Sequence, residues 1–189
     1  MKNAKFIIIL IVIVIIGAGV YLAVKRNQKL SQRSNLNINP TKNMKISSPA
    51  FGENENIPSK FTCDGESISP PLEIMGVPEN ARSLTLIVDD PDAPMAGGFV
   101  HWIVFDLNPD TKEIKENSVP ENAMEGTTSA DKTDYVGPCP PSGTHHYQFK
   151  TYALDIILGL DSSARREDIE KAMGGHILDQ ATLVGLYKR

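Results

Sequence analysis

The stretch Gly137-Pro138-Cys139-Pro140-Pro141-Ser142-Gly143-Thr144-His145-His146-Tyr147 decides how the chain is organised. It places a rigid Gly/Pro turn directly before two histidines and a tyrosine, and an alternating strand, 148–155, follows. Prolines fix φ and remove N–H donors, whereas glycines allow a backbone to approach a ligand closely. Because side chains alternate along a strand, His145 and Tyr147 share one face and His146 takes the other. The stretch therefore predicts one wall of a small anion-binding site.

Two earlier stretches predict the opposite wall. Asp89-Asp90-Pro91-Asp92-Ala93-Pro94 ends a β-branched strand, 83–89, in a constrained loop, and His101-Trp102 begins a second buried strand, 101–107. Each signal also has a plain structural interpretation, since aspartates cap turns and a buried tyrosine hydroxyl often only satisfies a hydrogen bond. The prediction rests on their combination.

The remaining body is rich in short strands. Further extended segments are expected at 44–47, 69–74 and 181–187, and the one clear helix at 164–173, with Ser162 and Ser163 as candidate caps and Gly174-Gly175 at its end. The polar, turn-rich residues 111–134 are expected to cover the site. Many strands with one late helix predict an all-β domain with small helical additions.

The first part of the chain predicts a membrane anchor. A short tail, 1–5, precedes nineteen uncharged residues, 6–24, which as a helix would reach about 28 Å, close to the thickness of a bilayer core. No A-x-A pattern follows, and the apolar run is longer than that of a cleaved signal peptide. The polar residues 25–43 predict a flexible tether.

The orientation of this single-pass anchor has two interpretations. Counting flanking Lys and Arg places the C-terminal side in the cytoplasm. A very short basic N-terminus before a long apolar run also resembles an uncleaved signal-anchor, which exports the domain. We favour export, and hence an extracytoplasmic domain at the membrane.

Charge argues against nucleic acid as a partner. Residues 1–43 hold seven of the 19 Lys and Arg and no acid, so 44–189 carries 12 basic and all 23 acidic residues. Affinity for nucleic acid comes largely from cationic contacts to phosphates, which so acidic a body does not offer. It can still bind a single phosphate locally.

Taken in order, the motifs resemble one family. DDPDAP (89–94), HW (101–102) and YVGPCPPSGTHHY (135–147) are similar to the phosphatidylethanolamine-binding protein family, in its bacterial and archaeal Raf-kinase-inhibitor-like branch. IPSKFTCDGESISPPLEI (57–74) and AMGGHILDQATLVGLYKR (172–189) resemble the borders of that branch, so the resemblance spans 44–189.

The resemblance implies a Greek-key β-sandwich with a solvent-accessible anion pocket at one end. The ligand-binding residues carried over by motif are Asp90, His101, Gly137, Pro140, Pro141, His145 and Tyr147, with Asp92 and Trp102 supporting the walls. Imidazoles and a hydroxyl would donate to phosphate oxygens, and a carboxylate would keep a histidine protonated or accept from an ammonium headgroup.

The two cysteines lie in matching motifs. Cys63 is in the TCDG turn and Cys139 in the GPCPP turn, and we expect both at the pocket rim. An exported domain would favour a disulfide between them, and a cytosolic one two reduced thiols. With no CxxC motif, a structural zinc site is not expected.

These features favour a membrane-tethered, non-catalytic module that binds a phosphate-bearing small molecule or a phospholipid headgroup. The sequence has no GxSxG, GxxxxGK[ST] or HExxH motif, and no cofactor or metal is expected. One alternative is an inhibitor or regulator that binds a kinase or protease through the same surface. A less favoured one is a metal-dependent hydrolase using Asp90, Asp92, His101 and His145.

Overall fold

The computed structural model describes residues 43–189. The expected transmembrane segment 6–24 and the tether up to residue 42 lie outside the described residues. Within 43–189, none of the helices is long and apolar enough to cross a membrane.

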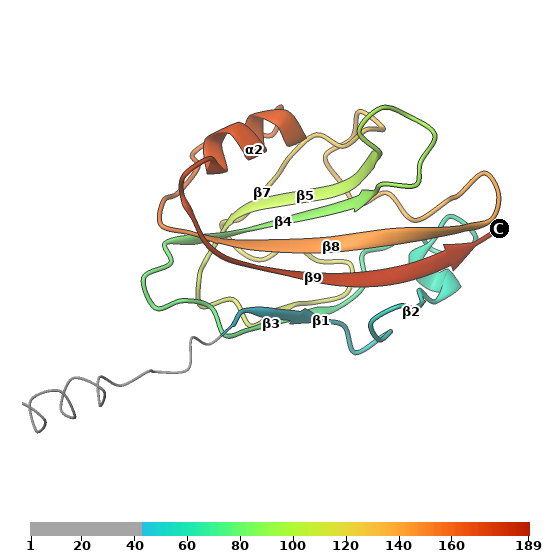
Figure 1. Ribbon diagram of the computed structural model, residues 1–189, viewed down its shortest axis with the longest axis horizontal. Coiled ribbons are helices and arrows are strands. Elements are labelled where there is room, and N and C mark those ends of the chain that lie inside the picture. The colour runs from blue at the N-terminus through green and yellow to red at the C-terminus, as the bar shows by residue number, and fades with distance from the viewer. Residues whose placement is uncertain (1–42) are drawn as a thin grey trace, which may run out of the picture. The chain divides into compact units, whose positions relative to one another are not determined.

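The described chain folds into two sheets (Figure 1). The larger has the order β2-β9-β8-β4-β5-β7, formed by Glu55–Asn56, Ile177–Lys188, Thr144–Leu154, Ser83–Asp90, Phe99–Leu107 and Met124–Glu125. The smaller has the order β1-β3-β6, formed by Lys45–Ser47, Leu72–Met75 and Glu113–Ile114. Neighbouring strands are antiparallel except for β2 and β9, which run parallel. The expected mostly-β sandwich with few helices is confirmed.

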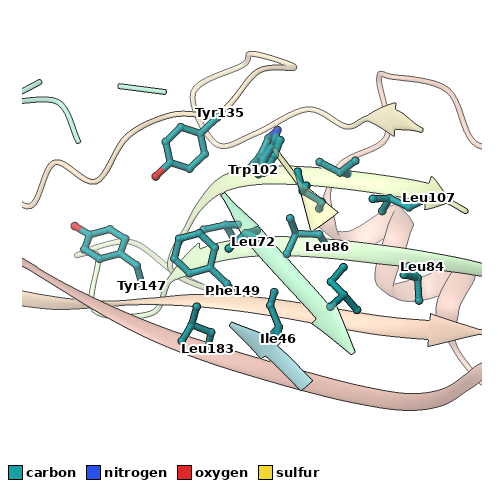
Figure 2. Close-up of a cluster of buried hydrophobic side chains, with 14 of the residues drawn as sticks. Ile46, Leu72, Leu84, Leu86, Trp102, Leu107, Tyr135, Tyr147, Phe149 and Leu183 are labelled. Atoms are coloured by element: carbon teal, nitrogen blue, oxygen red, sulfur yellow. The ribbon is translucent and has the colours of Figure 1, made fainter. Parts of the chain in front are cut away.

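Both faces of the large sheet are covered, which is why β4 is buried at every position. Its even-numbered side chains, such as Leu84 and Leu86, pack against the small sheet in the main core (Figure 2). Its odd-numbered Ile87 packs in a second cluster with Ile169 and Met173 of helix α2 (Arg166–Met173). The strand therefore presents side chains to two environments.

Three element boundaries differ from the prediction. Strand β8 begins at Thr144, four residues earlier than expected, so the two histidines and Tyr147 lie within the strand. Strand β9 also begins four residues early, at Ile177. Helix α2 begins at Arg166, and its first turn is capped by Asp168, which accepts from the Arg165 N–H at 3.0 Å. The predicted caps Ser162 and Ser163 were wrong, because the chain is still in a turn there.

A β-bulge alters the direction of His101. Val88 pairs with Trp102, but the next residue, Asp89, pairs with Val100, so His101 is an extra residue in β5. At such a bulge two residues oppose one, which re-aims a side chain. As a result both His101 and Trp102 pack on the inner face, where the His101 ring lies 5.2 Å from the ring of Tyr147.

Candidate functional site

A cavity of about 360 Å³ lies at one end of the large sheet. The β4–β5 loop and the segment before β8 both reach this end, as does the C-terminus (Figure 1). The structure brings all seven predicted ligand-binding residues to this cavity, whose lining residues are Asp90, Ala93, Pro94, Met95, Phe99, His101, Val136, Gly137, Cys139, Pro140, Pro141, His145 and Tyr147.

Asp90 and His145 form a buried pair in the cavity wall. Asp90 is the last residue of β4, and its Oδ2 lies 2.7 Å from Nδ1 of His145. Its Oδ1 accepts from the Asp92 backbone N–H at 2.9 Å, which fixes the carboxylate at the turn. Because Nδ1 of His145 is taken by Asp90, Nε2 is the ring nitrogen left for a ligand. The structure buries His145 and exposes His146. The two therefore face opposite sides, as alternation predicts, and His145, the one assigned to the site by the resemblance, is the inward one.

His101 is fixed as a particular tautomer. Its Nδ1 lies 2.7 Å from the carbonyl oxygen of Val136, and a carbonyl only accepts, so Nδ1 carries the proton. Burial lowers the pKa of His101, since desolvation disfavours the imidazolium. In the neutral ring Nε2 is then an acceptor. The expectation that both imidazoles donate to a ligand therefore does not hold for neutral His101.

Tyr147 supplies a protonated hydroxyl at the base of the site. Its side chain is fully buried at one end of the core, with the hydroxyl pointing away from the aliphatic side chains (Figure 2). Burial, together with the nearby Asp90 carboxylate, raises the pKa of Tyr147. Among the described residues this hydroxyl makes no hydrogen bond of normal geometry, although the nearby Cys139 backbone opposes the rise in pKa. Such orphan donors are rare in folded proteins, which makes it a polar group to which a ligand or water is expected to bind.

Part of the apolar wall was missed by sequence reasoning. Ala93 and Pro94 belong to the stretch 89–94 that was predicted to form a wall, and Met95 follows them in the β4–β5 loop. The ring of Phe99 is tilted against that of His101, with the centroids 4.7 Å apart. No sequence signal marked Met95, Phe99 or Val136 as wall residues. The expected cover from residues 111–134 was wrong, because that segment forms β6 and β7 at the sheet edges and contributes no lining residue.

Asp92 and Trp102, the two residues predicted to support the walls, lie outside the cavity. Asp92 lies on the exposed rim, where its Oδ2 accepts from the backbone N–H and Nδ1 of His146 at 2.9 and 2.7 Å. These hydrogen bonds lower the pKa of Asp92. Trp102 lies in the core behind the site and donates from Nε1 to Glu125 at 2.7 Å. Neither residue lines the cavity.

The Gly/Pro turn is bound tightly to a neighbouring loop. Cys139 forms a disulfide with Cys63, just beyond the short 3₁₀ helix Ser59–Phe61, with the Cα atoms 5.4 Å apart. The Gly137 N–H donates to Ser67 Oγ at 3.0 Å. A Cβ at Gly137 would lie 2.7 Å from that oxygen, so this close approach requires glycine. Of the two alternatives for these cysteines, the structure shows the disulfide.

The geometry of a metal site is not found in the described part of the chain. Within 43–189, no three His, Cys, Asp or Glu side chains are grouped so as to hold an ion. Asp92, one of the four ligands considered for a hydrolase, is turned to His146 on the rim.

The fold and cavity define a mostly-β sandwich domain with a small, largely apolar pocket that has a polar base, at the end of its larger sheet. The chain belongs to the phosphatidylethanolamine-binding protein family, whose family model matches residues 47–188.

Known relatives share most of the described chain. A UPF0098 protein of Methanothermobacter thermautotrophicus is 46% identical over 77% of this chain and 99% of its own length. A UPF0098 protein of Pyrococcus horikoshii is 48% identical over 77% of each. The crystal structure of a phosphatidylethanolamine-binding protein homologue of Chlamydia trachomatis is 39% identical, covers 78% of this chain and 99% of its own, and superimposes with a TM-score of 0.75. Escherichia coli YbcL, at 26% identity over 77% of this chain and 98% of its own, gives 0.74.

Proposed function

We propose that this protein is a non-catalytic binding module that takes a phosphate-bearing small molecule or a phospholipid headgroup into the cavity at the end of the large sheet. The observation that carries the proposal is the polar base of an otherwise apolar cavity. There Nε2 of His101, Nε2 of His145 and the Tyr147 hydroxyl have no partner among residues 43–189. A volume of about 360 Å³ lies in the range of small-ligand sites.

The lining residues support binding rather than catalysis. They include no serine, threonine or lysine, and their one cysteine is in the disulfide. Of the other side chains that can act as nucleophiles, Asp90 is paired with His145 and the Tyr147 hydroxyl is kept protonated by its raised pKa. Purified protein incubated with p-nitrophenyl phosphate should release nitrophenol no faster than buffer alone. Release of more than one nitrophenol per protein molecule would contradict a purely binding role.

Calorimetric titration tests the proposal. The full-length chain, purified in a neutral detergent because of the apolar residues 6–24, would be titrated with inorganic phosphate and phosphorylethanolamine. His145→Ala should weaken binding by about 1.5–3 kcal/mol, the usual contribution of a hydrogen bond to a charged group. The matched control is His146→Ala, next along the strand but exposed, which should leave affinity within about threefold. No binding of either anion would refute the proposal.

We propose further that residues 6–24 tether this module to a membrane, with the domain on the extracytoplasmic side. The Cys63–Cys139 disulfide supports this location, because disulfides persist mainly in oxidising compartments. Protease added to intact cells or spheroplasts should digest the domain. Full protection that is lost only on lysis would place it in the cytoplasm.

A further inference from the structure

A second concave site, a groove of about 800 Å³, lies at the end of the domain opposite the ligand cavity. One side is formed by the loop 76–81, which leads from β3 to β4, and the other by the segment 109–113, which leads from β5 to β6. Strand β4 begins next to this groove at Ser83 and ends in the cavity at Asp90 (Figure 1). The length of a strand therefore separates the groove from the proposed binding site.

The groove presents apolar surface to solvent. Met75, at the end of β3, is 53% exposed, although it is a large hydrophobic residue. Val77 and Ala81 are half-buried, and each packs one side against the main core. Pro78 and Pro109 make the two sides rigid, since proline fixes φ. Exposed apolar surface in a preformed groove is typical of a site that binds a partner, and a flexible methionine adapts to different partner side chains.

The groove is also negatively charged. Four of its lining residues are acidic and one is basic, and all five are exposed: Glu73, Glu79, Asp110, Glu113 and Lys112. In the described part of the chain none of the five forms an ion pair. The negative charge around the apolar surface is therefore not compensated by the domain itself. Such a field repels phosphates and anionic lipid surfaces and attracts a cationic partner.

Two of these carboxylates stand directly opposite each other. Glu73 of β3 is the cross-strand partner of Glu113 of β6, and both are exposed, whereas the next pair, Leu72 and Ile114, is buried. Like charges at directly opposite positions of a sheet destabilise it. A cation between the two carboxylates would remove this repulsion. Conflicts of this kind between local sequence and fold are expected at functional sites.

We propose that this groove binds a basic, extended polypeptide segment of another protein. Because residues two apart on a strand share a face, Glu73 and Met75 lie on one side of β3. A segment that runs along β3 would place an arginine or lysine against Glu73 and Glu113, and an apolar side chain two residues further on against Met75. Arginine suits the paired carboxylates best, since its planar guanidinium donates in two directions. The inference concerns a second partner and does not depend on the cavity.

Other cations fit the groove less well than such a segment. Within residues 43–189, no three His, Cys, Asp or Glu side chains are grouped so as to hold a metal ion. A linear polyamine carries positive charge but has no side chains to cover Met75 and Val77. A basic polypeptide supplies both the charge and the apolar contacts.

Fluorescence anisotropy on the full-length chain in neutral detergent tests this proposal, with empty micelles as the blank. The probe is a labelled peptide that repeats Arg-Arg-Val-Val, because this order places arginine and valine alternately on each face of an extended chain. Its affinity should fall about tenfold between about 50 and 500 mM NaCl, since salt screens exposed charges. Peptides with glycine for valine or glutamate for arginine should bind at least about tenfold more weakly.

The double variant Glu73→Gln/Glu113→Gln locates the site. It should weaken binding of the Arg-Arg-Val-Val peptide at least about tenfold without lowering the melting temperature, because it removes a repulsion. The matched control Glu121→Gln/Glu167→Gln changes the net charge equally at two exposed residues outside the groove, and should bind the peptide within about threefold of wild type. Phosphorylethanolamine should titrate the same way into both variants and the wild type, since its proposed site is the cavity.

Three results would overturn this inference. The first is no binding of the Arg-Arg-Val-Val peptide at millimolar concentration. The second is an equal loss of binding in both double variants, which would show attraction to net charge alone. The third is displacement of the peptide by spermidine at equal concentration, which would show that the groove attracts cations without recognising a polypeptide. Each of them leaves the proposed cavity function standing, because that function is tested by the anion titrations.

Discussion

At the scale of single residues, His101 links the candidate site to stability. Its folded-state pKa is lowered by burial, so below about pH 6.5 the unfolded chain binds a proton that the folded chain resists. Neutral His101 therefore contributes to the free energy of unfolding above the pKa of the unfolded chain, and this contribution is lost as the pH falls below that pKa. Wild-type protein without phosphate should therefore lose more stability between pH 7 and pH 5 than His101→Gln.

Urea unfolding at several pH values measures this difference. One proton contributes at most about 1.4 kcal/mol per pH unit. Because the carboxylates are common to both proteins, their acid effects cancel in the comparison. His176→Gln is the control, since His176 makes a half-exposed pair with Asp155. Parallel pH profiles for wild type and His101→Gln would show that His101 is not held neutral.

At the scale of elements, helix α2 is joined to the β4–β5 loop through Arg166. Its Nη1 lies 3.1 Å from Oδ2 of buried Asp89 and donates to the Gly97 carbonyl at 3.0 Å. Arg166→Ala should destabilise the fold by about 1–3 kcal/mol, because Asp89 keeps only Lys150, at 2.8 Å. Glu170→Ala is the matched control, since it removes the outer partner of Arg166 and keeps Asp89 paired. Equal melting temperatures for both variants would show that this buried bridge contributes nothing.

Strand β9 lies close against two core side chains at Gly185. A Cβ there would lie 2.6 Å from Cγ1 of Ile57 and 2.8 Å from the ring of Phe51. Gly185→Ala should therefore cost about 1–3 kcal/mol by overpacking. Gly174→Ala, at φ −56° and with its nearest contact at 3.2 Å, should cost clearly less in the same chemical denaturation experiment.

The sequence predicts strands better than it predicts their edges and irregularities. Hydrophobic, β-branched runs located β4 and β5, and alternation correctly placed His145 and Tyr147 on one face, opposite His146. No sequence pattern predicted the β-bulge at His101, because the bulge depends on the register between β4 and β5. The early start of β8 was missed because Thr144 and the histidines are polar and pair with the end of β9. The ion pair of Asp89 was not predicted, because its partner Arg166 lies far away in the sequence.

At the scale of the whole molecule, one sheet supports two different polar sites. Consecutive residues of β4 point to opposite faces, so Asp90 enters the cavity while Asp89 lies under helix α2. The β4–β5 loop that follows is held by both, through Asp92 to β8 and through Gly97 to Arg166. The apolar wall of the cavity is thus positioned from both faces of the sheet, which explains why Met95 and Phe99 could not be assigned to it from local sequence.

The disulfide connects two loops that lie far apart in the sequence. Cys63 and Cys139 are 76 residues apart. A disulfide typically stabilises a fold by about 2–4 kcal/mol, and more when it closes a long loop in the unfolded chain. Reductant should lower the free energy of unfolding by that amount. It should also weaken phosphate binding, because Cys139 and its proline neighbours form a cavity wall. The Cys63→Ala/Cys139→Ala variant should show both reduced values and no response to reductant. If oxidised and reduced wild type bind phosphate equally, the turn keeps its position through the Gly137–Ser67 hydrogen bond and packing alone.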